Sequence, residues 1–96
     1  MLEISKNNAE ILGKDTLLQQ TMEECGELVA AIGKFNRVNG LGQKTEVKLQ
    51  TAQDNLFTEI ADVSICIEQL VYLLDCEEQI INKRNEAFEK VKNRYN

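Results

Sequence analysis

Apolar residues recur along this chain at the spacing of a helix rather than that of a strand. Between residues 17 and 35 they fall on one helical face, formed by Leu17, Leu18, Cys25, Leu28, Val29, Ile32 and Phe35. No stretch alternates apolar and polar residues long enough to predict a half-buried strand. The chain also has no proline and only 5 glycines, so few residues would interrupt a helix. The pattern predicts an all-α protein.

Four helices are expected, at about residues 3–12, 15–38, 45–74 and 76–95. Gly13 ends the first, and the carboxylate of Asp15 is predicted to cap the second by accepting hydrogen bonds from its free amides. The segment 39–42 is predicted to be a loop, since it carries two glycines. No repeat or linker divides the chain, which indicates one domain over residues 1–96 with a four-helix-bundle-like arrangement.

The second half of the third predicted helix requires cover on all sides. Most residues from 60 to 74 are apolar and surround the helix axis, so every face of this segment must be buried. Only three other helices are available, and a chain of 96 residues buries only about 60–65% of its extended surface when it folds alone. We therefore expect self-association to a dimer or tetramer.

Composition excludes several classes of partner and chemistry. With 11 basic and 16 acidic residues the net charge is −5, whereas nucleic-acid backbones and anionic membranes attract clustered lysine and arginine. The longest apolar runs, such as residues 70–74, are far too short to span a membrane. Three cysteines without a C-x-x-C motif favour a reducing, cytoplasmic location. The absence of histidine excludes histidine-dependent catalytic triads.

Two pairs of carboxylates interrupt the apolar pattern. Glu24 and Glu27 lie on the second predicted helix, and Glu59 and Asp62 on the third, each pair three residues apart near the edge of the apolar face. One such pair alone is usually part of a solvated helix surface. Four converging carboxylates, however, repel one another unless a cation lies among them. An all-oxygen ligand set predicts Mg²⁺, with Mn²⁺ as a substitute.

These residues resemble the E-E-x-x-E and E-x-x-D motif of the all-α NTP pyrophosphohydrolases. That superfamily includes MazG-like proteins, dimeric dUTPases and phosphoribosyl-ATP pyrophosphohydrolase. In this chain the motif is Glu23-Glu24-Cys25-Gly26-Glu27, followed by Glu59-Ile60-Ala61-Asp62, and the likeness extends over roughly residues 17–94. The resemblance implies an oligomeric MazG-type architecture that hydrolyses nucleoside triphosphates to monophosphates and pyrophosphate, clearing non-standard or excess nucleotides.

The resemblance also implies roles for particular residues. Mg²⁺ would be held by Glu24, Glu27, Glu59 and Asp62. Glu24 would also be a catalytic residue, with Glu23 as a helper that is either a base or a ligand of a second metal.

Basic residues that could contact the phosphates lie mainly on the last predicted helix. Lys83, Lys90 and Arg94 share one face there, and relatives often carry lysine and arginine near the substrate on this helix. Basic residues are also common at helix C-termini, because they interact favourably with the helix dipole. Lys34 and Arg37 are candidates of the same kind. Gln20, one turn before Glu24, is the best candidate for a hydrogen bond to the base.

Two alternatives to a general NTP pyrophosphohydrolase remain open. The first is dUTP or phosphoribosyl-ATP hydrolysis in the same scaffold, although dimeric dUTPases generally have longer chains than this one. The second is a non-catalytic helical module with an interaction or regulatory role. The complete set of four carboxylates favours the enzyme over the module.

Overall fold

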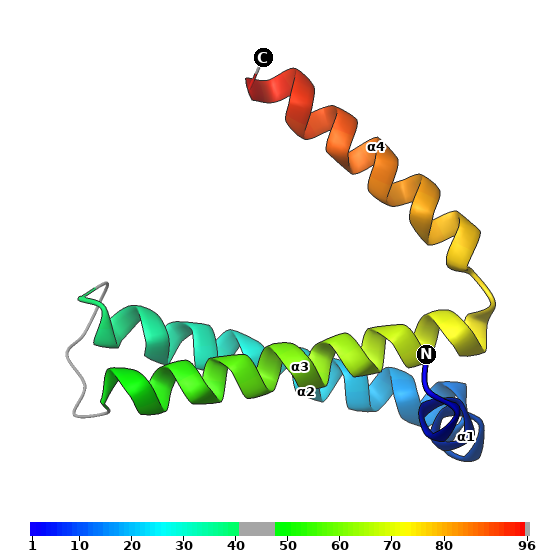
Figure 1. Ribbon diagram of the computed structural model, residues 1–96, viewed down its shortest axis with the longest axis horizontal. Coiled ribbons are helices and arrows are strands. Elements are labelled where there is room, and N and C mark those ends of the chain that lie inside the picture. The colour runs from blue at the N-terminus through cyan, green and yellow to red at the C-terminus, as the bar shows by residue number, and fades with distance from the viewer. Residues whose placement is uncertain (41–47, 96) are drawn as a thin grey trace.

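The computed structural model describes residues 1–40 and 48–95, and within those ranges the protein is all helical. Four helices follow one another along the chain (Figure 1): α1 (Glu3–Leu12), α2 (Lys14–Val38), α3 (Leu49–Leu74) and α4 (Glu77–Tyr95). The predicted all-α class is confirmed. Residues 41–42 of the predicted loop and 45–47 of the predicted third helix lie outside the described residues. None of the four described helices is both long and apolar enough to cross a membrane.

Backbone geometry, rather than a side-chain cap, sets the boundary between α1 and α2. Gly13 has φ 82°, a conformation that costs glycine little, and its amide donates to the carbonyl of Ala9. The prediction that Asp15 caps α2 is wrong. Gly13 occupies the N-cap position, and Asp15 lies in the first turn of α2, where no side chain forms a capping hydrogen bond. Its negative charge there still interacts favourably with the helix dipole.

The antiparallel pair of α2 and α3 forms the body of the protein (Figure 1). Small side chains dominate the core, which allows the two backbones to approach closely. The buried apolar residues are Ala9, Leu17, Ala31, Ala52, Val63 and Cys66. Thr21 is also buried, and its hydroxyl donates to the carbonyl of Leu17 at 2.6 Å, so this polar group is satisfied within its own helix.

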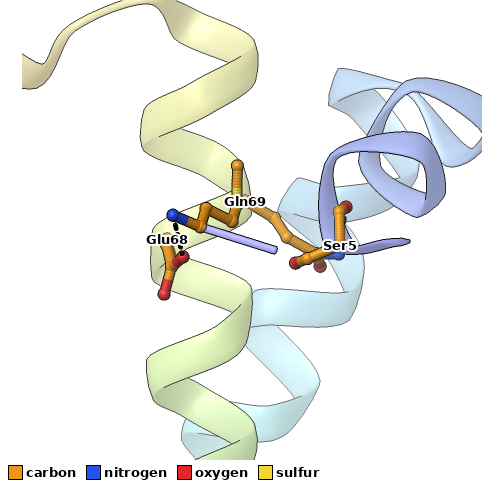
Figure 2. Close-up of polar contacts among 4 residues, drawn as sticks. Ser5, Glu68 and Gln69 are labelled. Atoms are coloured by element: carbon orange, nitrogen blue, oxygen red, sulfur yellow. Dashed lines mark hydrogen bonds and ion pairs between the residues drawn. The ribbon is translucent and has the colours of Figure 1, made fainter. Parts of the chain in front are cut away.

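Polar contacts attach α1 to α3. Gln69 is only 5% exposed, and its side-chain amide donates to the Ser5 carbonyl and to Oδ1 of Asn8, both at 3.0 Å. Figure 2 shows Gln69 reaching from α3 toward Ser5 on α1. Nearby, the hydroxyl of Tyr72 donates to the carboxylate of Glu10. These bonds hold α1 across one end of the α2–α3 pair.

Helix α4 departs from the rest of the chain. It turns away after Asp75, which has a left-handed φ of 49°, and among the described helices it contacts only α3 (Figure 1). Residues 77–94 are all exposed. The radius of gyration is 16.7 Å, whereas a compact domain of about 100 residues has about 13 Å. A closed four-helix bundle is therefore not formed within one chain, and that arrangement stays a prediction for an assembly.

The attachment of α1 depends on Gln69 in a testable way. Gln69→Ala leaves the Ser5 carbonyl and Asn8 without their donor, so the free energy of unfolding should fall by about 1–3 kcal/mol. Urea unfolding followed by circular dichroism measures the change. Gln53→Ala, on the exposed side of α3, is the matched control and should change stability little. Equal stability of both variants would contradict this role.

Candidate metal centre

Three of the four predicted carboxylate ligands converge between α2 and α3. Glu24 and Glu27 come from neighbouring turns of α2, and Glu59 from the facing side of α3. One carboxylate oxygen of each lies within 4.8 Å of the other two. The three-residue spacing puts both α2 carboxylates on one flank of the helix, and the antiparallel packing brings Glu59 opposite them.

Two oxygens of this cluster are buried without a partner. Oε2 of Glu24 and Oε2 of Glu59 have almost no contact with solvent, and neither accepts a hydrogen bond from the described residues. Both residues are partly buried overall, while Glu27 is exposed. A carboxylate oxygen removed from water without a donor or a cation is energetically costly. The arrangement therefore favours a bound cation.

The electrostatics of the cluster show the same conflict. Removal from water raises the pKa of Glu24, and the neighbouring charges of Glu27, Asp62 and Glu59 raise it further. The pKa of Glu59 is raised by the same causes, first by removal from water and then by Glu27 and Asp62. Asp62 is partly buried and lies outside the 4.8 Å group, but it is close enough for its charge to act on both glutamates.

The donor set fits Mg²⁺. In octahedral magnesium sites the oxygens lie about 2.1 Å from the ion, so opposite ligands are about 4.2 Å apart. Oxygens that already lie within 4.8 Å of one another can share one such ion after small side-chain movements. The ligands are all carboxylates, which suit hard cations such as Mg²⁺ and Mn²⁺.

A groove of about 200 Å³ adjoins the carboxylates. Its lining consists of Glu27, Ala30, Ala31, Lys34, Asn55 and Glu59. Lys34 was one of the sequence candidates, whereas Arg37 is not part of the lining. Asn55 was not identified from the sequence. Its position one turn before Glu59, on the same side of the helix, is the signal that could have found it.

The predicted basic residues of α4 lie away from the carboxylates. Lys83, Lys90 and Arg94 are exposed on α4, where Lys83 forms a 3.5 Å ion pair with Glu86. Because α4 turns away from the α2–α3 pair after Asp75 (Figure 1), one chain does not bring these cations to the cluster. Gln20 and Glu23 are exposed on α2 beside Glu24, and neither lines the groove. Their predicted roles stay predictions.

A larger hollow of about 620 Å³ lies between α1, α3 and the start of α4. It contains none of the clustered carboxylates. Its charged lining mixes both signs and includes Lys6 and Arg84 together with Glu68, Asp75 and Glu77. Since this hollow lies apart from the carboxylate cluster, the groove beside Glu27 and Glu59 is the better candidate for substrate binding.

Comparisons with models of protein families, with curated protein sequences and with solved structures found no match to this chain. The case for a function therefore depends on the motif and on the geometry of the cluster.

The raised pKa values make a prediction about stability. The pKa values of Glu24 and Glu59 in the folded protein lie above the ordinary value of 4.5, so the folded protein binds more protons than the unfolded chain above that pH. The free energy of unfolding without divalent ions should therefore fall as the pH rises from 4.5 toward neutrality. Glu59→Gln removes one of these charges, so its melting temperature in EDTA should exceed that of the wild type by a margin that grows with pH.

The same variant should respond less to metal. Millimolar Mg²⁺ should raise the melting temperature of the wild type by mass action and that of Glu59→Gln much less. Thermal melts from pH 4.5 to 7.5, with EDTA or Mg²⁺, measure both effects. Glu3→Gln, which removes an exposed carboxylate on α1, is the control. Identical pH profiles for wild type and Glu59→Gln would contradict the assignment.

Proposed function

We propose that this protein is a Mg²⁺-dependent nucleoside triphosphate pyrophosphohydrolase of the MazG-like kind, which releases a monophosphate and pyrophosphate. The observation that carries the proposal is the convergence of Glu24, Glu27 and Glu59 from two helices to within 4.8 Å. These are three of the four residues that the E-E-x-x-E and E-x-x-D motif assigns to the metal. Two of them carry buried oxygens without a partner, which supports a cation there.

In this proposal the carboxylates hold the metal, and the positive charge of the metal offsets the repulsion between the carboxylates and an anionic substrate. Bound Mg²⁺ supplies positive charge to the phosphate oxygens and lowers the pKa of a coordinated water. Glu24, Glu27 and Glu59 position the ion, and Asp62 completes the predicted ligand set from the next turn of α3. Glu23 is exposed next to Glu24, where it can serve as a base or a ligand to a second ion.

The proposed role is the clearance of non-standard or excess nucleotides in the cytoplasm, with Mn²⁺ able to replace Mg²⁺. All three cysteines are free, as expected in a reducing compartment. Hydrolysis of dUTP or phosphoribosyl-ATP in the same scaffold is the nearest alternative, and the ranking of substrates separates these activities. A non-catalytic module is less favoured, because it gives no reason for unpaired buried carboxylate oxygens.

Activity gives the direct test. Purified protein with Mg²⁺ should release pyrophosphate from at least part of a broad NTP and dNTP panel, and EDTA should abolish the release. Glu24→Gln and Glu59→Gln should each lower kcat/KM by at least about 100-fold, since even residues that only support metal ligands contribute 10- to 100-fold.

The control for this assay is Glu3→Gln, which should retain wild-type activity. Activity that survives in both ligand variants would assign the reaction to another site. A folded protein with no activity on the whole panel would favour the non-catalytic module.

Self-association is part of the proposal. The exposed surface of the chain is 7553 Å², whereas a compact monomer of 10.9 kDa exposes about 5,600 Å². The excess of about 2,000 Å² exceeds the roughly 800 Å² that each partner buries in a standard interface. Exposed apolar residues lie on every helix, and those of α4 share one helical face, formed by Ile80, Ile81, Phe88 and Val91. We therefore propose a dimer or tetramer in which this face is covered.

Phe88 provides the test of that interface. It is 62% exposed in the single chain, so Phe88→Asp should leave the fold intact but weaken association at least about tenfold by placing a charge in an apolar contact. Asn93→Asp adds the same charge on the opposite side of α4 and is the matched control. Sedimentation velocity over a concentration series measures both. A monomeric wild type, or equal masses for the two variants, would contradict the proposal.

A further inference from the structure

The groove beside the carboxylates has two chemically different ends. Glu27 and Glu59 line one end, and Lys34 and Asn55 line the other. Lys34 follows Glu27 by seven residues and Asn55 precedes Glu59 by four, so at 1.5 Å per residue they lie about 10 Å and about 6 Å further along their helices. Because α2 and α3 are antiparallel, both offsets run in the same direction, toward the α2–α3 connection.

The floor between these ends is open because small residues form it. Ala30 and Ala31 carry only methyl groups, so no long side chain fills the space between Glu27 and Lys34. Among the described residues, Lys34 forms no salt bridge, which leaves its ammonium group available to an anion. The amide of Asn55 adds hydrogen-bond donors on the opposite wall.

The size of the groove limits what it can hold. Pockets that enclose drug-sized ligands measure about 300–1,000 Å³, whereas this groove is about 200 Å³. The groove is smaller than a pocket that encloses a whole drug-sized ligand, so it suits a part of a nucleoside triphosphate, such as two linked phosphates. A lysine and an amide at one end and a metal-binding carboxylate pair at the other suit a short polyphosphate that carries a divalent cation.

We propose that Lys34 and Asn55 bind the two terminal phosphates of the substrate, the part that leaves as pyrophosphate, while the nucleoside lies outside this groove. The inference rests on the proposed function, and it assigns Lys34 and Asn55 as substrate-binding residues in addition to the metal ligands. Recognition within the groove is then directed at the phosphate chain rather than at the base. The same residues bind inorganic pyrophosphate with Mg²⁺ as a product complex.

Calorimetric titration with inorganic pyrophosphate at saturating Mg²⁺ tests the assignment without depending on turnover. Lys34→Ala should weaken binding about 10- to 100-fold, because it removes a charge-assisted hydrogen bond. Asn55→Ala should weaken it severalfold, and Lys34→Arg should retain more affinity than Lys34→Ala. Lys14→Ala, an exposed lysine at the start of α2, is the matched control and should bind like the wild type.

Two further readouts separate binding of pyrophosphate from loss of the metal site or of the fold. The rise in melting temperature caused by Mg²⁺ alone should be the same in the wild type and Lys34→Ala, since Lys34 is not a metal ligand in this arrangement. In hydrolysis assays, Lys34→Ala should raise KM by a similar factor for every nucleotide that the wild type cleaves, whatever its base.

The outcomes distinguish this inference from the proposed function. If the wild type hydrolyses nucleotides but Lys34→Ala binds Mg²⁺–pyrophosphate normally, the inference is wrong and the function stands. If pyrophosphate binds through Lys34 but no nucleotide is hydrolysed, the phosphate site stands, whereas the proposed function and the assignment of this site to a leaving pyrophosphate are wrong. Absence of pyrophosphate binding by the wild type, or a KM effect that differs more than tenfold between bases, would overturn the inference.

Discussion

The antiparallel packing of α2 against α3 is the constraint on which the rest of this structure depends. The two helices meet through small buried side chains such as Ala31, Ala52 and Val63, which keeps their backbones close. That closeness brings Glu59 to Glu24 and Glu27 although more than thirty residues separate them in the chain. It also forms both walls of the adjacent groove, so the candidate metal centre and the candidate phosphate site result from one helix pair.

The same packing brings carboxylates together at a cost in stability. Glu24 and Glu59 lose water and face other carboxylates, which raises the pKa of both, and each leaves one buried oxygen without a partner. A fold selected for stability alone would place neutral or apolar side chains at these positions. A divalent cation bound there would relieve this conflict, which links the electrostatic cost of the cluster to the proposed chemistry. Strain of this kind is characteristic of functional sites.

The apolar residues of helix α4 are not covered by the rest of the described chain. This helix leaves the helix pair after Asp75 and exposes Phe88 and other apolar residues, so one chain cannot cover its own apolar surface. The predicted basic residues Lys83, Lys90 and Arg94 lie on this same helix. Contact between these residues and substrate would therefore require the proposed assembly, whereas Lys34 and Asn55 lie beside the carboxylates within one chain.

Local patterns determined much of this protein. The helical spacing of apolar residues and the lack of proline predicted the four described helices, because helix formation depends mainly on residues a few positions apart. The same spacing marked the carboxylates that converge. Local patterns failed at Asp15, because Gly13 could adopt the backbone conformation that the boundary needed. Only the packing of α2 on α3 placed Asn55 across from Lys34, and only the turn at Asp75 set α4 apart. The position of Asn55 and the direction of α4 depend on contacts between helices and on backbone angles in a turn, which the pattern of residues along a single helix does not determine.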